Sequence, residues 1–399
     1  MRTSGVLLFI AYLGFISLGL PDAAHGINWP FVRIEFGVPI GWLGLVILSS
    51  GIGYLISSFS VGYLLSRLGV GRLLILSSFL VSLGLLGFYS SSSFIVFVLF
   101  AVLIGMGSGA IDAGLNAYAA EHFSTRHMNW LHAAFGVGAT TGPIIITTVL
   151  VNFSQNWRLG YAVLAVILFT ITVVFIFSRN LWESDKHLPQ NVENTTDETS
   201  NLSTDLPRKV TQIQALKHPV IQYQIAFFFL YTGVEFGIGQ WAFTVMTESR
   251  GISLASAGTW VAVYWGSLAF GRAVFGFLVE RFSVDVLLRL CLIGVAFGVV
   301  LFNISITPYT SYAGLTLVGF CAAPIFPSMI SQTVVRVGKS YSTHAIGFQV
   351  SAAVMGGMTL PVISGLVGER FGLDWLSITF LIYALGLFGL FHLISKRTA

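Results

Sequence analysis

The sequence predicts an all-α integral membrane protein with twelve transmembrane helices arranged as two six-helix pseudo-repeats. Three observations carry this prediction: the scarcity of charge, the recurrence of long apolar runs, and a single polar segment between them. Only 9 % of the 399 residues are Asp, Glu, Lys or Arg, and 55 % are hydrophobic, whereas a soluble domain carries about 25 % charged residues. Too little polar surface remains to coat a water-soluble globule, which excludes a cytosolic enzyme, an extended nucleic-acid binder and a disordered protein.

The apolar runs define the helices one by one, because about 20 apolar residues cross the hydrocarbon core as a helix. The first run has no small-residue cleavage site after its apolar core, so we expect a retained helix and not a signal peptide. The twelve predicted spans are residues 4–29, 41–65, 71–90, 93–120, 128–152, 156–178, 219–246, 254–279, 285–304, 309–335, 342–367 and 374–395.

One polar segment, residues 183–217, interrupts the runs and is predicted to be a solvated linker. It divides the chain into an N-terminal six-helix bundle (1–180), a cytoplasmic linker (181–217) and a C-terminal six-helix bundle (218–399). We expect the protein to be monomeric, with the lipid bilayer as its surroundings.

The distribution of Lys and Arg predicts the orientation, since cytoplasmic loops are enriched in both. With the N-terminus in the cytoplasm, 15 of the 20 Lys and Arg residues lie inside, four lie outside and Arg272 lies within a helix. Both termini and the linker are therefore placed in the cytoplasm, and a bacterial plasma membrane is the expected location. The net charge of +4 follows from this bias and does not indicate nucleic acid as a partner.

No pattern typical of an enzyme or a metal site occurs in the chain. Cys291 and Cys321 both fall within apolar runs, so neither a disulfide framework nor a CxxC metal site is expected. HExxH, GxSxG and Walker A sequences are absent, which argues against catalysis and against ATP-driven transport. We expect no enzyme activity, no metal and no cofactor.

The two halves repeat each other weakly, with nearly constant offsets. Asp22 and Glu235 lie 213 residues apart, and the pairs Asn28-Trp29 and Gln240-Trp241 lie 212 apart. Two further matches have an offset of 214: Gly37-Val38 with Gly251-Ile252, and Gly62-Tyr-Leu-Leu-Ser66-Arg67 with Gly276-Phe-Leu-Val-Glu280-Arg281. Such repetition indicates duplication with the same topology, as in major facilitator transporters, and places a solute site between the halves near the bilayer midplane.

Three acids at membrane depth are the candidates for proton coupling: Asp112, Glu235 and Asp22. Each costs roughly 2.5–3.5 kcal/mol on insertion scales, so such groups face a cavity or a partner. A carboxyl group that binds a proton from one side and releases it to the other couples transport to a proton gradient. The alternative for each is a structural acid that is hydrogen-bonded or paired with a buried Arg or His.

Neutral polar and aromatic residues near these acids are the candidates for binding the solute. Asn116 lies four residues after Asp112, so both project from one face of a helix. Carboxylates, amides and indoles commonly line a site for a polar solute. The alternatives are interhelical contacts for His132 and Asn129, and a place at the membrane interface for the two tryptophans. The predicted binding residues are Asn116, His132, Asn129, Asn28, Trp29, Gln240 and Trp241.

The segment between the second and third runs reads Gly62-x-x-x-Ser66-Arg67-x-Gly69-x-Gly71-Arg72. It resembles motif A of the major facilitator superfamily, with Ser66 where the motif has an acid. The resemblance implies that charges here hold the cytoplasmic gate, and the second half retains an acid that Arg272 could pair with. The predicted gating residues are Arg67, Arg72, Arg272, Glu280 and Arg281, with plain positive-inside anchoring as the alternative.

The fifth run contains Gly136-x-Gly138-x-x-x-Gly142-Pro143, which predicts a closely packed and kinked helix. Antiporters of the superfamily carry a GPxxGG continuation at this place, whereas this chain reads Gly-Pro-Ile-Ile-Ile-Thr. The departure counts mildly against drug:proton antiport.

Four stretches resemble the fucose permease branch of the superfamily, which comprises sugar:proton symporters. They are Gly107-Ser-Gly109-Ala-Ile-Asp112-Ala-Gly-Leu-Asn116 (similar to GxGxxExxxN), Tyr231-Thr-Gly233-Val-Glu235, Gly319-Phe320 to Pro327-Ser328, and Gly356-Gly357-x-x-x-Pro361. The resemblance implies that Asp112 is the carboxylate for proton and sugar. Helix 1 departs from it, because Gly26 stands where the family has an acid before Pro30; Asp22, one turn earlier, is the expected substitute, and His25 is adjacent.

Together these features predict secondary active uptake of a small polar solute, with a sugar favoured, by proton-coupled alternating access. The expected partners are that solute and protons. One alternative is a proton-antiport exporter of drugs or metabolites, and a second is a transporter-like receptor that does not transport.

Overall fold

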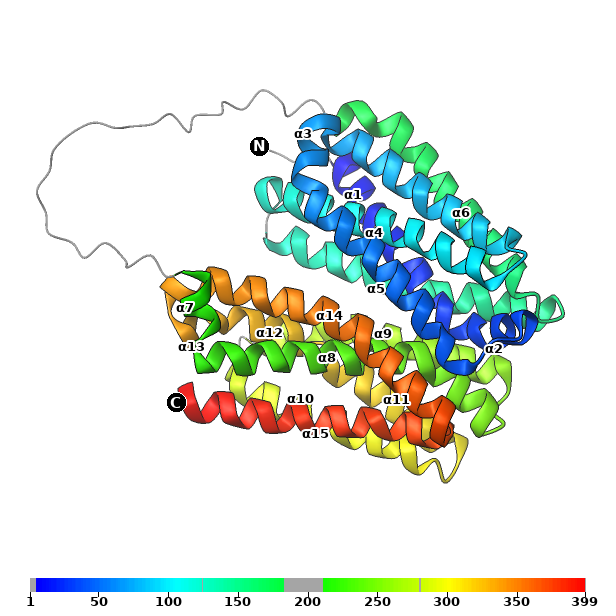
Figure 1. Ribbon diagram of the computed structural model, residues 1–399. Helices are drawn as coiled ribbons and strands as arrows, with labels where there is room; N and C mark the ends of the chain where they lie inside the picture. The colour runs from blue at the N-terminus through cyan, green and yellow to red at the C-terminus, as the bar shows by residue number, and fades with distance from the viewer. Residues whose placement is uncertain (1–4, 124, 183–210, 280, 399) are drawn as a thin grey trace, which may run out of the picture.

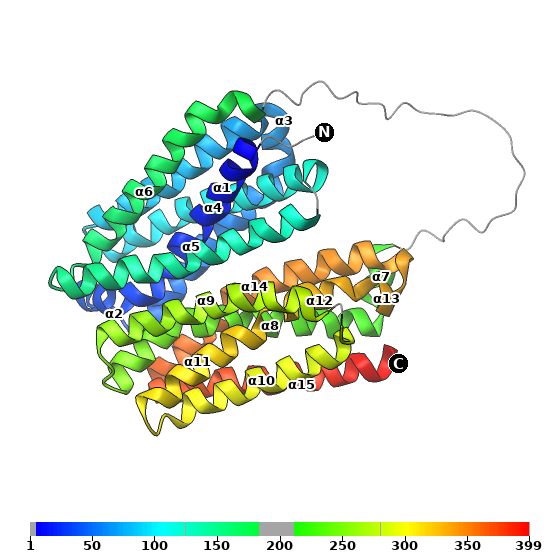
Figure 2. The same cartoon turned by 180° about the vertical axis from the view of Figure 1, so that it is seen from behind.

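The computed structural model describes residues 5–123, 125–182, 211–279 and 281–398, and every regular element in these ranges is a helix. The helices form two groups that lie side by side (Figure 1), and the same two groups are separate in the reverse view (Figure 2). The prediction of an all-α protein is confirmed.

The first group contains the helices up to the polar segment. Its elements are α1 (Gly5–Asp22), α2 (Ala24–Phe36), η1 (Ile40–Trp42), α3 (Leu43–Ser90), α4 (Phe94–His122), α5 (Thr125–Asn152), α6 (Trp157–Ser178) and η2 (Arg179–Trp182). The second group contains α7 (Gln212–Leu216), α8 (Pro219–Thr244), the π-helical turn η3 (Val245–Ser249), α9 (Leu254–Leu278), α10 (Val284–Ile304), α11 (Pro308–Ala322), α12 (Ile325–Ser331), α13 (Thr333–Val337), α14 (Lys339–Phe371) and α15 (Leu373–Thr398).

The helices agree with the twelve predicted spans when one long helical stretch is counted as two spans and α8 is added. Ten helical stretches in the described ranges are long and apolar enough to cross a membrane. One of them, Ile40–Ser90, has 51 residues and holds two predicted spans, joined by a kink at Gly69. Gly69 has φ +71°, a conformation that glycine adopts without the steric cost of a Cβ. The 26-residue α8, which is not among the ten, is the remaining span.

Two predicted spans are interrupted. The first runs to Phe36 and is broken between α1 and α2, directly after Pro21 and Asp22. The tenth is divided into α11, α12 and α13, with Pro324 before the second piece. Proline removes a backbone donor and disrupts the helix before it, which explains the break ahead of Pro324, whereas α1 continues through Pro21 and ends one residue later.

Small residues bring the helices of the first group close together. A Cβ atom at Gly138 would overlap the carbonyl oxygen of Ile16, and one at Gly142 would overlap that of Leu20. The close packing predicted for the fifth run is therefore confirmed, and its partner is α1.

The contacts that join the two groups gather toward one end of the molecule, which we call the closed end and define by Arg33, Gly41, Glu248 and Glu369. There Arg33 pairs with Glu248 at 2.6 Å, and the Gly41 N–H donates to Glu369 Oε2 at 3.1 Å. Further contacts run along α5 and α9 and between α3 and α14. The closed end is thus bound by polar contacts from both groups.

The opposite end, where α1 begins and α15 ends, is the open end. There, a Cβ atom at Gly62 of α3 or at Gly347 of α14 would have no neighbour within 4 Å. The same two helices touch nearer the closed end, where Gly51 packs against Met358. The halves therefore separate toward the open end (Figure 1).

Candidate functional site

Asp112 lies on α4 and its carboxylate accepts hydrogen bonds from two side chains. Asn116 Nδ2 donates to Oδ1 at 2.8 Å, as expected for residues four apart on one helix face. The Tyr54 hydroxyl of α3 donates to Oδ2. Tyr54 was not among the predicted residues, although a tyrosine in the middle of an apolar run is the kind of signal that could have identified it.

A chain of charged and titratable side chains leads from this carboxylate to the second half. Asp22 at the end of α1 and His132 on α5 lie close enough to Asp112 for electrostatic interaction, and His132 in turn lies close enough to Arg272 on α9. Asp22, Asp112 and Arg272 are half-buried, and His132 is exposed toward the space between the halves. The imidazole of His132 packs edge-on against Phe15 of α1. We call Asp22, Tyr54, Asp112, Asn116, His132 and Arg272 the central cluster.

Glu235 extends this arrangement into the second half. Its side chain on α8 is only 6 % exposed, and Oε1 lies 3.4 Å from Nη2 of Arg272. The neighbouring Tyr264 hydroxyl donates to the Glu235 backbone oxygen at 2.8 Å. The sequence predicts Arg272 as a gating residue that could pair with Glu280, but the structure places it against Glu235 and within electrostatic reach of His132. Glu280 itself lies outside the described residues.

This buried pair supports a stability prediction. Arg272→Met leaves the Glu235 carboxylate buried without its cation, which we expect to destabilise the protein by roughly 3 kcal/mol. The double variant Arg272→Met/Glu235→Gln should recover most of that loss, because no uncompensated charge remains. Thermal unfolding of the purified protein measures both effects. The control is Arg289→Met on the exposed face of α10, which should leave the midpoint nearly unchanged; equal destabilisation by the single and double variants would contradict the pairing.

Gln240 joins the two halves instead of facing the open space. Its Nε2 donates to the backbone oxygen of Asp22 at 2.7 Å, at the point where α1 and α2 are interrupted. A Cβ atom at Gly26 would overlap the backbone of Gln240, so the absence of a side chain there allows α2 and α8 to meet. The helix break therefore supplies a free carbonyl that the second half binds.

The other predicted binding residues of the repeated segments are fully buried near the closed end. The Trp29 indole donates to the Ile40 oxygen, and the Trp241 indole donates to the Pro361 oxygen, both at 2.8 Å. Neither is exposed at a membrane interface. Asn28 is buried beside Gly160 of α6. Any contact of these residues with a solute would require the closed end to open.

Two aromatic residues that contact His25, Tyr161 and Phe88, were not predicted from the sequence. The Tyr161 hydroxyl of α6 lies 3.2 Å from Nδ1 of His25, within a buried cluster that includes Phe88.

The side chain of Asn129 lies outside the described residues, although its backbone is part of α5. In the described ranges, no group of three His, Cys, Asp or Glu side chains is arranged to hold a metal ion.

A comparison with protein families identifies what kind of molecule carries this site. The sequence profile of the Major Facilitator Superfamily matches residues 7–282 and 241–398. The chain belongs to the major facilitator superfamily. It is therefore a membrane transporter and not an enzyme, and the predicted resemblance to the superfamily is confirmed.

Individual members of the superfamily are similar over nearly the whole chain. The glucose/mannose transporter GlcP of Bacillus subtilis is 23 % identical over 381 residues, covering 94 % of this chain and 90 % of that protein. The solved structure of a bacterial homologue of the human lysosomal transporter Spinster has a TM-score of 0.77 and 12 % identity, with 100 % of this chain and 98 % of that chain covered. The nucleoside transporter NupG has a TM-score of 0.74 and 13 % identity over 96 % and 98 % of the two chains. The two structures share the fold.

The residues that resemble motif A of the superfamily lie at the open end. Arg67, Arg72 and Arg281 are exposed, and none of the ion pairs between described residues includes them. The Arg67 guanidinium lies over the Tyr63 ring at 5.5 Å. Their gating role remains a prediction. The halves are apart at this end, and a charged gating residue contacts its partner only when the halves meet.

Proposed function

We propose that this transporter takes up a hexose-class sugar together with protons, by alternating access of one central site. The observation that carries the proposal is the central cluster: a carboxylate held by a tyrosine and an amide of its own half, with His132 in electrostatic reach of both this carboxylate and the arginine of the other half. The sugar class is supported by the printed name of the relative, a glucose/mannose transporter, which is similar over 94 % of this chain.

The charges of the central cluster offer a reason for coupling. When Asp112 is ionised, its charge acts on the His132 imidazole, on which Arg272 of the other half also acts with the opposite sign, and it repels the Asp22 carboxylate. Protonation of Asp112 removes one of these charges, and a neutral carboxyl group can donate as well as accept a hydrogen bond to a sugar hydroxyl. Binding of a proton therefore changes both the balance of charges around His132 and the hydrogen bonds available to the solute.

We further propose that the open end faces the cytoplasm of a bacterial cell and that the protein acts as a monomer. The excess of Lys and Arg in the loops of that end supports this orientation. The closed end, with its Arg33–Glu248 pair, then seals the site from the outside. In this arrangement a solute released from the central cluster leaves toward the cytoplasm.

Transport by purified protein in liposomes tests the proposal. We expect counterflow of labelled glucose or mannose and, with an inward proton gradient, uphill accumulation that a protonophore abolishes. Addition of the sugar outside should make the external medium more alkaline. Uridine and fucose, presented at the same concentration, are the matched comparison solutes. Acidification of the medium on solute export would support antiport instead, and an absence of counterflow with every hexose would overturn the sugar class.

A further inference from the structure

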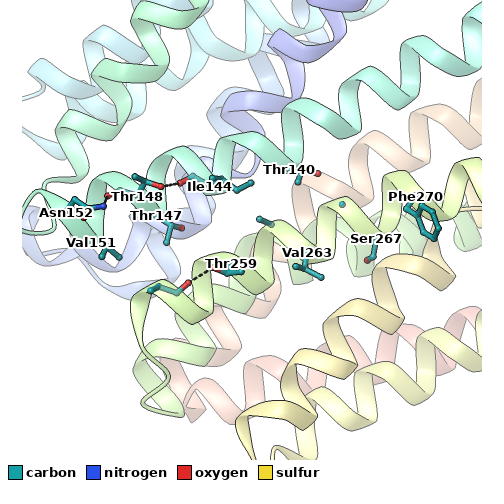
Figure 3. Close-up of a pocket in the computed structure, with 13 residues that line it drawn as sticks. Thr140, Ile144, Thr147, Thr148, Val151, Asn152, Thr259, Val263, Ser267 and Phe270 are labelled. Atoms are coloured by element: carbon teal, nitrogen blue, oxygen red, sulfur yellow. Dashed lines mark hydrogen bonds between the residues drawn. The ribbon is translucent and has the colours of Figure 1, made fainter.

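A groove of about 600 Å³ lies between α5 and α9, apart from the central cluster. Its walls come from both halves of the protein, with Ile144, Thr148 and Val151 on one side and Thr259, Val263 and Phe270 on the other (Figure 3). At 100° per residue, Thr148 projects about 160° around α5 from His132. The groove therefore opens on the opposite side of the α5–α9 contact from the charged site.

The groove is part of the surface that faces the membrane. Ile144, Val151 and Phe270 are all exposed large apolar side chains on helices that are long and apolar enough to span a bilayer. In the reverse view α5 and α9 lie next to each other at the front of the molecule (Figure 2). Hydrocarbon, and not water, surrounds such a surface in the membrane.

Four of the five hydroxyl groups that line the groove are already used by their own helices, and the fifth, on Thr147, is buried without a hydrogen-bond partner among the described residues. Thr140, Thr148, Thr259 and Ser267 each donate to a backbone oxygen three or four residues earlier, at 2.7–2.8 Å. The Asn152 amide at the rim donates to the Thr148 oxygen in the same way. With these donors satisfied, the threonines present mainly methyl groups, so the lining suits an apolar chain better than a polyhydroxylated solute.

The dimensions match a single lipid leaflet. From Thr140, near the middle of α5, to Asn152 at its end, the groove extends about 18 Å along the helix, close to the roughly 15 Å of one leaflet's hydrocarbon. No Lys or Arg lines it, so the lining offers nothing to select a headgroup. We propose that this groove binds one acyl chain of a phospholipid from the leaflet at the closed end.

The bound chain would contact both halves at the seam where they are most tightly joined. There the Thr147 side chain fills the space above Gly258, and no Cβ atom could be added at that glycine without overlap. An acyl chain beside this seam adds apolar contacts that are lost when α5 and α9 separate. The lipid therefore stabilises the arrangement in which the closed end is shut.

Photo-crosslinking of the full-length protein in phosphatidylglycerol vesicles tests the proposal. The probe is phosphatidylcholine with a diazirine near the end of one acyl chain, and cross-linked peptides are mapped by mass spectrometry. We expect several-fold more cross-links on residues 140–152 and 255–270 than on the exposed face of α10. Val263→Trp fills the groove and should reduce these cross-links several-fold, whereas the control Leu290→Trp on α10 should not.

A second variant from the opposite wall, Ile144→Trp, keeps the test decisive if Val263→Trp does not fold. Even labelling of all exposed helices, or unchanged labelling in both groove variants, would overturn the proposal. Displacement of the probe by excess glucose would also overturn it, because the groove would then be a solute site. The result does not depend on which sugar the central cluster transports.

Discussion

Asp112→Asn is expected to abolish uphill accumulation of the solute while leaving exchange across the membrane partly intact. A proton that crosses about 100 mV supplies about 2.3 kcal/mol, enough for about 40-fold accumulation. Asparagine cannot carry that proton, so accumulation should fall toward equilibrium. The amide can still form hydrogen bonds with Tyr54 and Asn116, which preserves the shape of the site.

The matched control for this variant is Glu121→Gln. It makes the same chemical change on the same helix, but the Glu121 side chain is exposed near the end of α4. Accumulation and counterflow of a labelled hexose are measured for both variants in the same liposomes. Full accumulation by Asp112→Asn would remove this carboxylate from the coupling step, and loss of counterflow as well would indicate a binding role alone.

Gly26→Val is expected to hold the closed end open and to stop transport without unfolding the protein. A Cβ atom at this position overlaps the Gln240 backbone, which belongs to the other half. The halves can relieve the overlap by moving apart, at the loss of the hydrogen bond from Gln240 to Asp22. Spin labels on Ile34→Cys of α2 and Trp375→Cys of α15, both exposed at the closed end, should report a longer distance.

Valine variants of two other glycines serve as comparisons for Gly26→Val. Gly62→Val makes the same change in α3 with no neighbour within 4 Å of the new Cβ, so the label distance at the closed end should be retained. Gly105→Val instead forces a side chain against the Ser50 backbone within one half, so it should lower the unfolding temperature. A distance in Gly26→Val equal to that of the parent protein would contradict this account of how the halves close.

The local part of the site could be predicted from the sequence, and its partners could not. Asp112 and Asn116 share a helix face by their spacing, so the bond between them follows from helix geometry. Tyr54 lies 58 residues from Asp112, and Gln240 lies 218 residues from Asp22. No periodicity relates residues on separate helices, because their contact depends on how whole helices are placed.

The placement of Arg272 illustrates the same limit. Its position eight residues before an acid in the sequence gave a reason to pair Arg272 with Glu280. The structure directs its guanidinium to Glu235 on α8, 37 residues away, and brings it within electrostatic reach of His132 of the other half. A charge in a membrane-spanning helix takes the partner that packing brings to it, and sequence distance does not measure that.

The sequence by itself determined the class of molecule, the number of spans and the few charges that lie at membrane depth. These follow from composition and run length, because a bilayer admits only apolar helices of a minimum length. Only the tertiary structure decided that the halves meet at one end, that Gln240 binds the carbonyl freed by the break after Asp22, and that a groove with exposed apolar side chains lies between α5 and α9. Those features depend on contacts between distant faces, whose energies come from packing and are not encoded in any local pattern.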